Sequence, residues 1–550
     1  MCIGTTLTSV LFNQEIIHIL YLDNHVIYLN IIMVQGACLL AGFITISACI
    51  KHVSADRNET HNNEEKILIL GAGISGISAA KTLHDQGYTN IEVLEGSNRV
   101  GGRVKSVNLS GYAVELGAQW IYGAGSNPMV KLASEYNLDF KLGLDTWTLR
   151  DDLGNDLTEN GYEEYKKLVQ ALGDLHVFST EMRNNGTSDM TAEALLRFCG
   201  WSPDSVVADA VEAAFIDAEF GRESPSISGK YMNHHNVFRE HGDDSWFIVN
   251  DTRGYEYIVE KLKDSFLPKD DKRMVFNKKV THIENWDVKD SMVKVYTDDG
   301  TLFEADYVIV TFSLGVLQSR NVTFSPPLPD WKLVAIDKFG VGLYMLMYFK
   351  FSTSFWDNTT WIVHVTERHG EYFGWFNMNY IFPGCNILQL QLAGAEAKAA
   401  DRMEDSKLTT KAMEVLRAMY PLANVSEPEN FITSRWMSDP LDFGAFSYWT
   451  PSFTLKDMDD LGQRIGNLYF AGEYINKTNH GYVHSAYTSG ISAALELMAC
   501  IEDNSLCQDR EITKEAENKC TVNDGNGMTQ YLYRVFVLVI IAVQMKIIML

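Results

Sequence analysis

The chain has 550 residues, of which 46% are hydrophobic and 21% charged, and its formal net charge is −25 at pH 7. This length allows two domains or one large composite with a substantial core. The negative charge argues against a nucleic-acid-binding protein, because phosphates attract Lys and Arg. It suits a cationic small-molecule ligand, although an acidic surface that serves only solubility gives the same composition.

The N-terminal region carries an apolar run. The first 50 residues contain no Lys or Arg, and residues 31–50 form twenty consecutive positions without a charge. Such a run can span a bilayer, or it can belong to a signal segment cleaved near Ala55. The missing basic stretch disfavours the signal segment. We expect residues 1–63 to be a leader or membrane segment followed by a polar linker.

The first chemical signal is a glycine-rich stretch, residues 66–81, which reads "KILILGAGISGISAAK". The pattern predicts a buried strand, a helix and then a second strand that ends at Glu95. Gly71 permits the tight turn, Gly73 lets the backbone approach a pyrophosphate, and Gly76 lets the helix pack closely on the strand. A carboxylate at Glu95 can accept hydrogen bonds from ribose hydroxyls. This βαβ context predicts a dinucleotide site for either NAD or FAD.

Further elements follow in a mixed order. Residues 158–220 predict mostly helices, and residues 273–310 predict alternating strands with a turn at Asp299-Gly300. An apolar strand is expected within residues 464–473, followed by a helix. The first strands and the late strand and helix therefore belong to one doubly wound domain, and the residues between them form other structure. We expect the two domains to be interleaved in the sequence.

Eight Asn-X-Ser/Thr sequons favour the secretory route, since their number is more informative than any single one. They begin at Asn58, Asn108, Asn185, Asn250, Asn321, Asn358, Asn424 and Asn476. Cys500 and Cys507 bracket a short polar loop and can pair in an oxidising compartment or remain two free thiols. The cysteines show no metal-binding spacing.

The C-terminus has the layout of a glycolipid-anchor signal: small residues 523–527, a short spacer, and an apolar run to the end. Lys546 within that run counts against the anchor, and a short membrane span is the competing interpretation. Either way, we expect a product of the secretory pathway that is extracellular or attached to the cell surface.

Several long motifs decide between NAD and FAD. "EGSNRVGGRV" begins at Glu95, "VELGAQW" ends at Trp120, and "YFAGEYINKTNHGYVHSAYTSG" follows much later. With these motifs, the sequence resembles the flavin-dependent amine oxidase family, and within it the secreted plant-type polyamine oxidases. The resemblance covers residues 65 to about 507.

The resemblance implies an α/β, two-lobed fold, with a Rossmann-like FAD domain interleaved with a mixed sheet-and-helix substrate domain. The implied FAD domain comprises residues 64–150, 245–315 and 455–500. The implied substrate domain comprises residues 151–244 and 316–454, and residues 501–550 form a tail with the apolar anchor segment. It also implies FAD as cofactor, bound by Gly71, Gly73, Gly76, Glu95, Arg103, Val280, Glu473 and Val483.

The implied activity is the removal of a hydride equivalent from the carbon next to an amine. The imine then hydrolyses, and oxygen takes up the electrons as hydrogen peroxide. Matching positions imply that Phe446 and Tyr482 flank the substrate carbon. Tyr344, Glu219 and Phe220 correspond to residues of the substrate tunnel. Without the resemblance, core packing is the simpler interpretation for each aromatic residue.

Two positions depart from the family pattern. Tyr122 stands where plant-type polyamine oxidases carry a glutamate, and Leu346 stands where the family carries a lysine that holds a water near the flavin. Lys350 is one repeat further along the same strand face, about 13 Å away, and cannot substitute directly. The departures leave open an alternative function, a catalytically weak FAD-binding surface protein.

Overall fold

The structure is a computed structural model, and it describes residues 6–12, 15–22, 25–31, 65–123, 125–232, 245–288, 290–503, 505 and 507. The expected apolar segment beyond Ile31 and the expected C-terminal anchor segment lie outside these residues. The chain divides into two units, Met1–Asn62 and Asn63–Leu550.

In the first unit, three strands form an antiparallel sheet in the order β1-β2-β3. They are β1 (Thr6–Phe12), β2 (Glu15–Leu22) and β3 (His25–Ile31). Across both units, none of the described helices is both long enough and apolar enough to cross a membrane.

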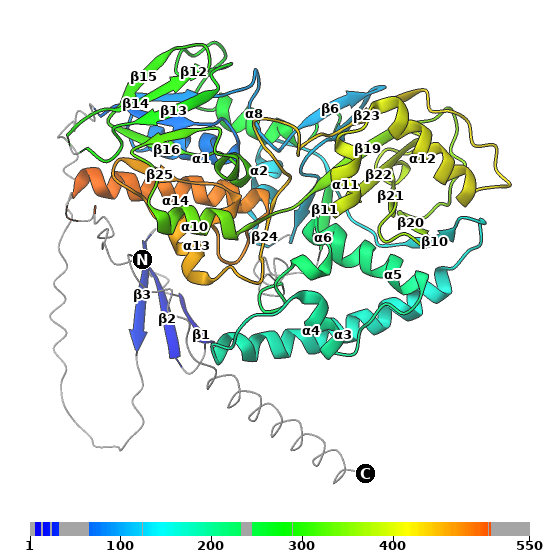
Figure 1. Ribbon diagram of the computed structural model, residues 1–550. Coiled ribbons are helices and arrows are strands. Elements are labelled where there is room, and N and C mark those ends of the chain that lie inside the picture. The colour runs from blue at the N-terminus through cyan, green and yellow to red at the C-terminus, as the bar shows by residue number, and fades with distance from the viewer. Residues whose placement is uncertain are drawn as a thin grey trace, which may run out of the picture. The chain divides into compact units, whose positions relative to one another are not determined.

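The second unit contains a five-stranded parallel sheet in the order β12-β5-β4-β16-β25 (Figure 1). Its strands are β4 (Ile67–Leu70), β5 (Ile91–Leu94), β12 (Met274–Val275), β16 (Tyr307–Val310) and β25 (Leu468–Phe470). All four residues of β4 are buried, as expected for a central parallel strand covered on both faces.

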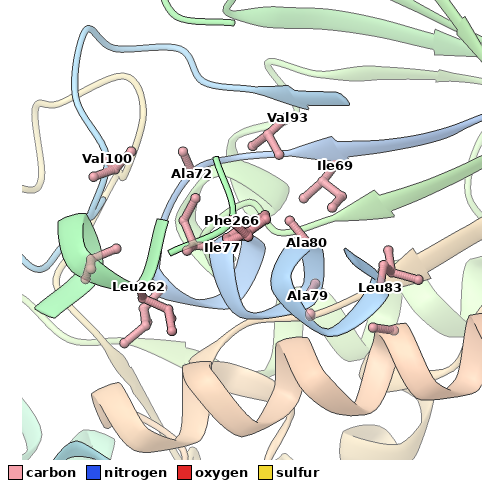
Figure 2. Packing of buried hydrophobic residues seen from close by; sticks show 14 of the residues in the cluster. Ile69, Ala72, Ile77, Ala79, Ala80, Leu83, Val93, Val100, Leu262 and Phe266 are labelled. Carbon is pink, nitrogen blue, oxygen red and sulfur yellow. The ribbon is translucent and has the colours of Figure 1, made fainter. Parts of the chain in front are cut away.

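Two helices pack against each other beside this sheet, α1 (Ile74–Asp85) and α14 (Val483–Glu502). A Cβ added at Gly490 would lie 2.0 Å from the carbonyl oxygen of Ser75, so the helices touch through backbone. On the sheet side, Ile77 and Ala80 of α1 pack beneath Ile69 (Figure 2). Glycine is therefore required where the helices cross.

A six-stranded sheet forms the other large layer of this unit, in the order β10-β20-β21-β22-β19-β23. All of its pairs are antiparallel except β10 with β20. In the β19–β22 ladder, Leu346 lies opposite Gln391 and Tyr348 lies opposite Gln389. The strands are β10 (Trp147–Asp151), β19 (Tyr344–Lys350), β20 (Trp361–Val365), β21 (Gly374–Asn377), β22 (Ile387–Ala393) and β23 (Asn430–Thr433).

Smaller sheets and further helices complete the second unit. The remaining strands are β6 (Ser106–Leu109) with β7 (Tyr112–Glu115); β8 (Trp120–Tyr122), β11 (Trp246–Val249) and β9 (Phe140–Leu142); β15 (Leu302–Ala305), β14 (Val293–Thr297), β13 (Val280–Glu284) and β17 (Thr323–Ser325); and β18 (Gly340–Val341) with β24 (Ser447–Tyr448). The remaining α-helices are α2 (Pro128–Glu135), α3 (Thr158–Asn184), α4 (Ala192–Phe198), α5 (Val206–Glu212), α6 (Ala218–Phe220), α8 (Glu256–Asp264), α9 (Leu314–Ser319), α10 (Asp330–Lys338), α11 (Gly394–Asp401), α12 (Asp405–Met419) and α13 (Leu455–Gly462). A π-helical turn, η1 (Ala213–Asp217), joins α5 to α6, and short 3-10 turns are η2 (Ser224–Ser226), η3 (Met378–Tyr380) and η4 (Glu473–Ile475).

The structure confirms the helices expected within residues 158–220 and the strands expected within 273–310. The late strand is shorter than predicted, because a tight turn at Gly466, with φ of +50°, delays its start to Leu468. Cys500 and Cys507 form a disulfide, with their Cα atoms 5.0 Å apart.

The helix crossing gives a stability prediction. Substituting Gly490→Ala should lower the melting temperature by several degrees, because overpacking against backbone costs about 1–3 kcal/mol. Gly173→Ala in α3 is the matched control, since nothing lies within 4 Å of its added Cβ. The control should be neutral or slightly stabilising, by up to about 1 kcal/mol. Equal melting temperatures for the two variants, measured by calorimetry, would contradict the crossing.

Candidate active site

One cavity of about 1050 Å³ brings together nearly all of the residues predicted for the site. Gly76 is the exception: its added Cβ would lie 2.0 Å from the carbonyl oxygen of Gly71, so it packs the helix against the turn instead. The predicted residues that line the cavity are Gly71, Gly73, Glu95, Arg103, Tyr122, Glu219, Phe220, Val280, Tyr344, Leu346, Phe446, Glu473, Tyr482 and Val483.

Two helices begin at the wall of this cavity. Helix α1 begins after Gly73 and helix α14 begins after Tyr482; neither has a side-chain cap or an acidic residue in its first turn. A Cβ at Gly73 would meet only the carbonyl oxygen of Gly101, at 4.0 Å, so the backbone there is open. The free N–H groups and the positive dipole end at the start of α1 favour bound phosphate, so this is the phosphate-binding end of the cavity.

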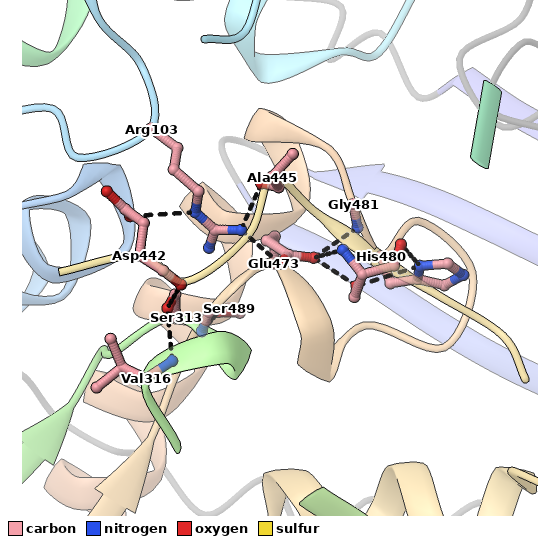
Figure 3. Close-up of polar contacts among 11 residues, drawn as sticks. Arg103, Ser313, Val316, Asp442, Ala445, Glu473, His480, Gly481 and Ser489 are labelled. Atoms are coloured by element: carbon pink, nitrogen blue, oxygen red, sulfur yellow. Dashed lines mark hydrogen bonds and ion pairs between the residues drawn. The ribbon is translucent and has the colours of Figure 1, made fainter. Parts of the chain in front are cut away.

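A buried ion pair lies beside these helix ends (Figure 3). The Nη1 atom of Arg103 donates to Glu473 Oε1 at 2.9 Å and to the carbonyl oxygen of Ala445 at 2.8 Å. Burial alone would lower the pKa of Arg103, but Glu473 and Asp442 outweigh it and raise the pKa. Within the described parts of the chain, its Nη2 has no hydrogen-bond acceptor, which leaves a charged donor for a phosphate oxygen.

Glu95 is held by backbone at the end of β5. Its two carboxylate oxygens accept from the N–H groups of Ala72 and Ser97, both at 2.8 Å. Each oxygen retains a lone pair for a hydroxyl group. Val280 lies at the same end, where the N–H of Lys278 bonds to the carbonyl oxygen of Glu95. A diphosphate with ribose hydroxyls therefore fits this end of the cavity.

The other end of the cavity is aromatic and carries a carboxylate. Tyr482 Oη donates to Glu219 Oε1 at 2.9 Å, and the Tyr122 ring stands edge-on to Tyr482 at 5.3 Å between centroids. The rings of Tyr344 and Phe446 lie 5.8 Å apart. Glu219 is open to the solvent in the cavity, but the protein around it removes enough water to raise its pKa, and the bond from Tyr482 opposes this only in part. A carboxylate among aromatic faces is a site for an organic cation.

A π-helical turn, η1, precedes Glu219. Single π turns inside α-helices are frequent at functional sites, because they re-aim the side chains that follow. His369 anchors this segment from outside: its Nε2 lies 2.6 Å from Asp217 Oδ2 and its Nδ1 lies 2.8 Å from Asp209 Oδ1. These two carboxylates raise the pKa of His369 to about 10, so a cationic histidine clamps the helix that carries Glu219 and Phe220.

Leu346 is only 2% exposed and packs in an apolar cluster with Phe376 and Trp436. It contributes no polar group to the cavity. Lys350 bonds to the carbonyl oxygen of Phe351 and pairs with Glu429 at 3.7 Å. The prediction that Lys350 does not take the place of a lysine at Leu346 is therefore confirmed.

The cavity wall also contains residues that the sequence analysis missed. Gln119 and Gln391 are polar and buried, and Asp145 lies among large aromatic side chains. Strand β22 contains two glutamines, Gln389 and Gln391, and its other residues are all apolar. This contrast in the sequence could have indicated that they belong to a site. The missed aromatic residues are Trp120, Trp147, Tyr162, Tyr165, Phe215, Trp246, Phe312, Trp361, Phe373 and Trp436. The described residues contain no cluster suited to a metal ion.

Comparisons with known proteins agree with this geometry. Polyamine oxidase 1 of Zea mays is 32% identical over 465 residues, which covers 80% of this chain and 91% of that protein. Polyamine oxidase 7 of Oryza sativa subsp. japonica is 32% identical over 448 residues, covering 78% of this chain and 94% of that protein. The solved structure of wild-type putrescine oxidase bound to putrescine matches with a TM-score of 0.64 at 18% identity, covering 79% of this chain and 99% of that one.

The structural match supports the expected two-lobed α/β fold. The family model described as flavin containing amine oxidoreductase matches residues 74–498, which is most of the chain. FAD fits the cavity end formed by the N-terminus of α1, Arg103 and Glu95. The chain therefore belongs to the flavin-containing amine oxidoreductase family, whose cofactor is FAD.

Proposed function

We propose that this protein oxidises an amine, a polyamine or a related compound, with molecular oxygen as the electron acceptor. The amine loses two hydrogens and becomes an imine, oxygen gains them as hydrogen peroxide, and water hydrolyses the imine to an aldehyde. One observation carries the proposal: a single cavity joins a phosphate-binding end to an aromatic end that holds Glu219. Polyamine oxidases among the relatives support the substrate class.

In this proposal, FAD held by the start of α1, Arg103 and Glu95 would supply the hydride acceptor, and the chain would orient the amine and exclude water. Phe446 and Tyr482 flank the reacting carbon, while Glu219 attracts the cationic nitrogen. Tyr344 and Phe220 line the approach.

We also propose the FAD domain expected from the sequence, residues 64–150, 245–315 and 455–500. All five strands of the parallel sheet fall within these ranges, which supports the proposal.

A peroxide assay with a panel of amines tests the function. Purified, FAD-loaded protein should release peroxide with at least one di- or polyamine. FAD-loaded protein that releases none with any amine would favour the alternative, a catalytically weak flavoprotein.

The two departures from the family give a prediction. Tyr122→Glu should tighten polyamine binding by one to two decades, because a charge-assisted contact contributes about 1.5–3 kcal/mol. Leu346→Lys should speed reoxidation of the reduced flavin, since a lysine can hold a water that leucine cannot. Stopped-flow measurements on both single variants and the double variant check this. Brisk spermine oxidation by the wild type, with unchanged reoxidation in Leu346→Lys, would contradict it.

The raised pKa of Glu219 gives a pH prediction. A raised pKa means that the carboxyl group becomes neutral at a higher pH than an ordinary glutamate does, so attraction for the cation is lost earlier on acidification. The KM for a cationic amine should therefore rise as pH falls, with a midpoint above the usual 4.5. In Glu219→Gln the KM should be high and flat over the same acidic range. If the KM of both proteins changed with pH in the same way, Glu219 would not be part of the binding site.

We further propose that the chain enters the secretory pathway and becomes extracellular or membrane-attached. The disulfide supports this, since such bonds persist in oxidising compartments. Several sequons also support it, because their asparagines are exposed: Asn108, Asn185, Asn321, Asn358 and Asn424.

Expression in animal cells tests the localisation. Glycosidase treatment should increase the gel mobility of the product, because sugar is removed from the exposed sequons. A cytosolic product whose mobility does not change would refute the proposal.

A further inference from the structure

A chain of buried side-chain hydrogen bonds runs behind the aromatic end of the cavity. Tyr344 Oη donates to Gln391 Oε1 at 2.5 Å, and Gln391 Nε2 donates to Gln389 Oε1 at 3.0 Å. Gln389 Nε2 then donates to Gln119 Oε1 at 2.9 Å and to Tyr348 Oη at 2.6 Å. Gln389 and Tyr348 have no exposed surface, whereas Tyr344, Gln391 and Gln119 line the cavity.

A backbone carbonyl fixes the direction of every bond in this chain. Tyr348 Oη donates to the carbonyl oxygen of Glu115 at 2.5 Å, and a carbonyl oxygen can only accept. The single hydroxyl hydrogen of Tyr348 is thereby used, so Gln389 must turn its nitrogen toward Tyr348. Its oxygen then faces Gln391 and accepts from the Gln391 amide.

The two ends of the chain consequently differ in polarity. Gln391 turns its oxygen toward Tyr344, which uses the only hydroxyl hydrogen of Tyr344, so Tyr344 offers the cavity only lone pairs. At the other end, Gln119 has its oxygen engaged by Gln389. Within the described residues nothing accepts from Gln119 Nε2, so it offers donors. Leu346, opposite Gln391, adds no polar group.

We propose that this fixed polarity determines specificity: Tyr344 acts as an obligate acceptor that selects a ligand nitrogen bearing an N–H, and Gln119 binds the oxygen of a water. The inference rests on the proposed amine substrate and adds how its nitrogen is recognised. Charge attraction by Glu219 cannot make this distinction, because a fully methylated ammonium carries the same charge without an N–H. The positioning residues are Gln389, Gln391 and Tyr348, which act through Tyr344 and Gln119.

The experiment compares two probes by calorimetry on FAD-loaded protein without oxygen: α,ω-diaminooctane and its bis(trimethylammonium) analogue. The wild type should bind the diamine roughly tenfold or more tightly than the analogue, the range expected for one hydrogen bond from a charged donor. Tyr348→Phe removes the group that forbids the reversed direction, although this residue does not line the cavity. The preference should fall to a few-fold, because Tyr344 can then turn its hydroxyl hydrogen toward the ligand.

Tyr372→Phe is the matched control. Tyr372 is also buried, and its hydroxyl has no partner among the described residues, so its loss should leave the preference unchanged. Gln391→Leu provides a second route, since it removes the acceptor of Tyr344 directly and should also reduce the preference. This variant decides the question if Tyr348→Phe does not fold.

The results distinguish a failure of this inference from a failure of the proposed function. A wild type that binds and oxidises amines, with an unchanged probe preference in the folded Tyr348→Phe or Gln391→Leu variant, overturns the polarity inference alone. A wild type that neither binds nor oxidises any amine overturns both.

Discussion

The backbone contact between α1 and α14 is the constraint on which the site depends. Gly490 brings the two helices together at the carbonyl of Ser75, and Gly76 brings α1 onto the turn at Gly71. Both helices begin at the wall of the cavity, and neither N-terminus is capped. A Cβ at Gly490 would separate the two helices, and a Cβ at Gly76 would separate α1 from the glycine turn before it.

The cavity has opposite electrostatic character at its two ends. The start of α1 and Arg103 supply hydrogen-bond donors at one end, where Arg103 also forms a partly buried ion pair with Glu473. Glu219 makes the other end negative within aromatic walls. A diphosphate therefore finds hydrogen-bond donors at the first end, and the proposed cationic amine would find a carboxylate at the second.

The sequence predicted the elements that depend on the spacing of nearby residues. The glycine turn, the first strand and α1 follow from short-range spacing, and the cofactor residues follow from the motif that contains them. The late strand is shorter than predicted, because the chain makes a tight turn at Gly466 and pairs with the sheet only from Leu468. The residues proposed to bind substrate came from the long motifs, since no local pattern distinguishes a core tyrosine from a tyrosine in a cavity wall.

The glutamine chain could not be predicted in this way. Gln119 precedes a short strand far from Gln389 and Gln391, and only the β19–β22 register sets Tyr348 and Leu346 beside those glutamines. An alternating pattern predicts which face is buried, but it does not determine the direction of a hydrogen bond.

That direction bears on Leu346 and Tyr122, the two positions expected from the sequence to depart from the family pattern. Removing charges from a buried cavity avoids their desolvation cost, but it also removes directional recognition. A chain of neutral amides can still present a donor at one end and an acceptor at the other, provided that a backbone carbonyl fixes one of its bonds. Here the carbonyl of Glu115 fixes the hydroxyl of Tyr348. An amide can bond equally well in either orientation until such an anchor exists. The hydrogen-bonded side chains behind Leu346 are therefore uncharged, but their donors and acceptors have a fixed order. Tyr348, which fixes that order, does not line the cavity.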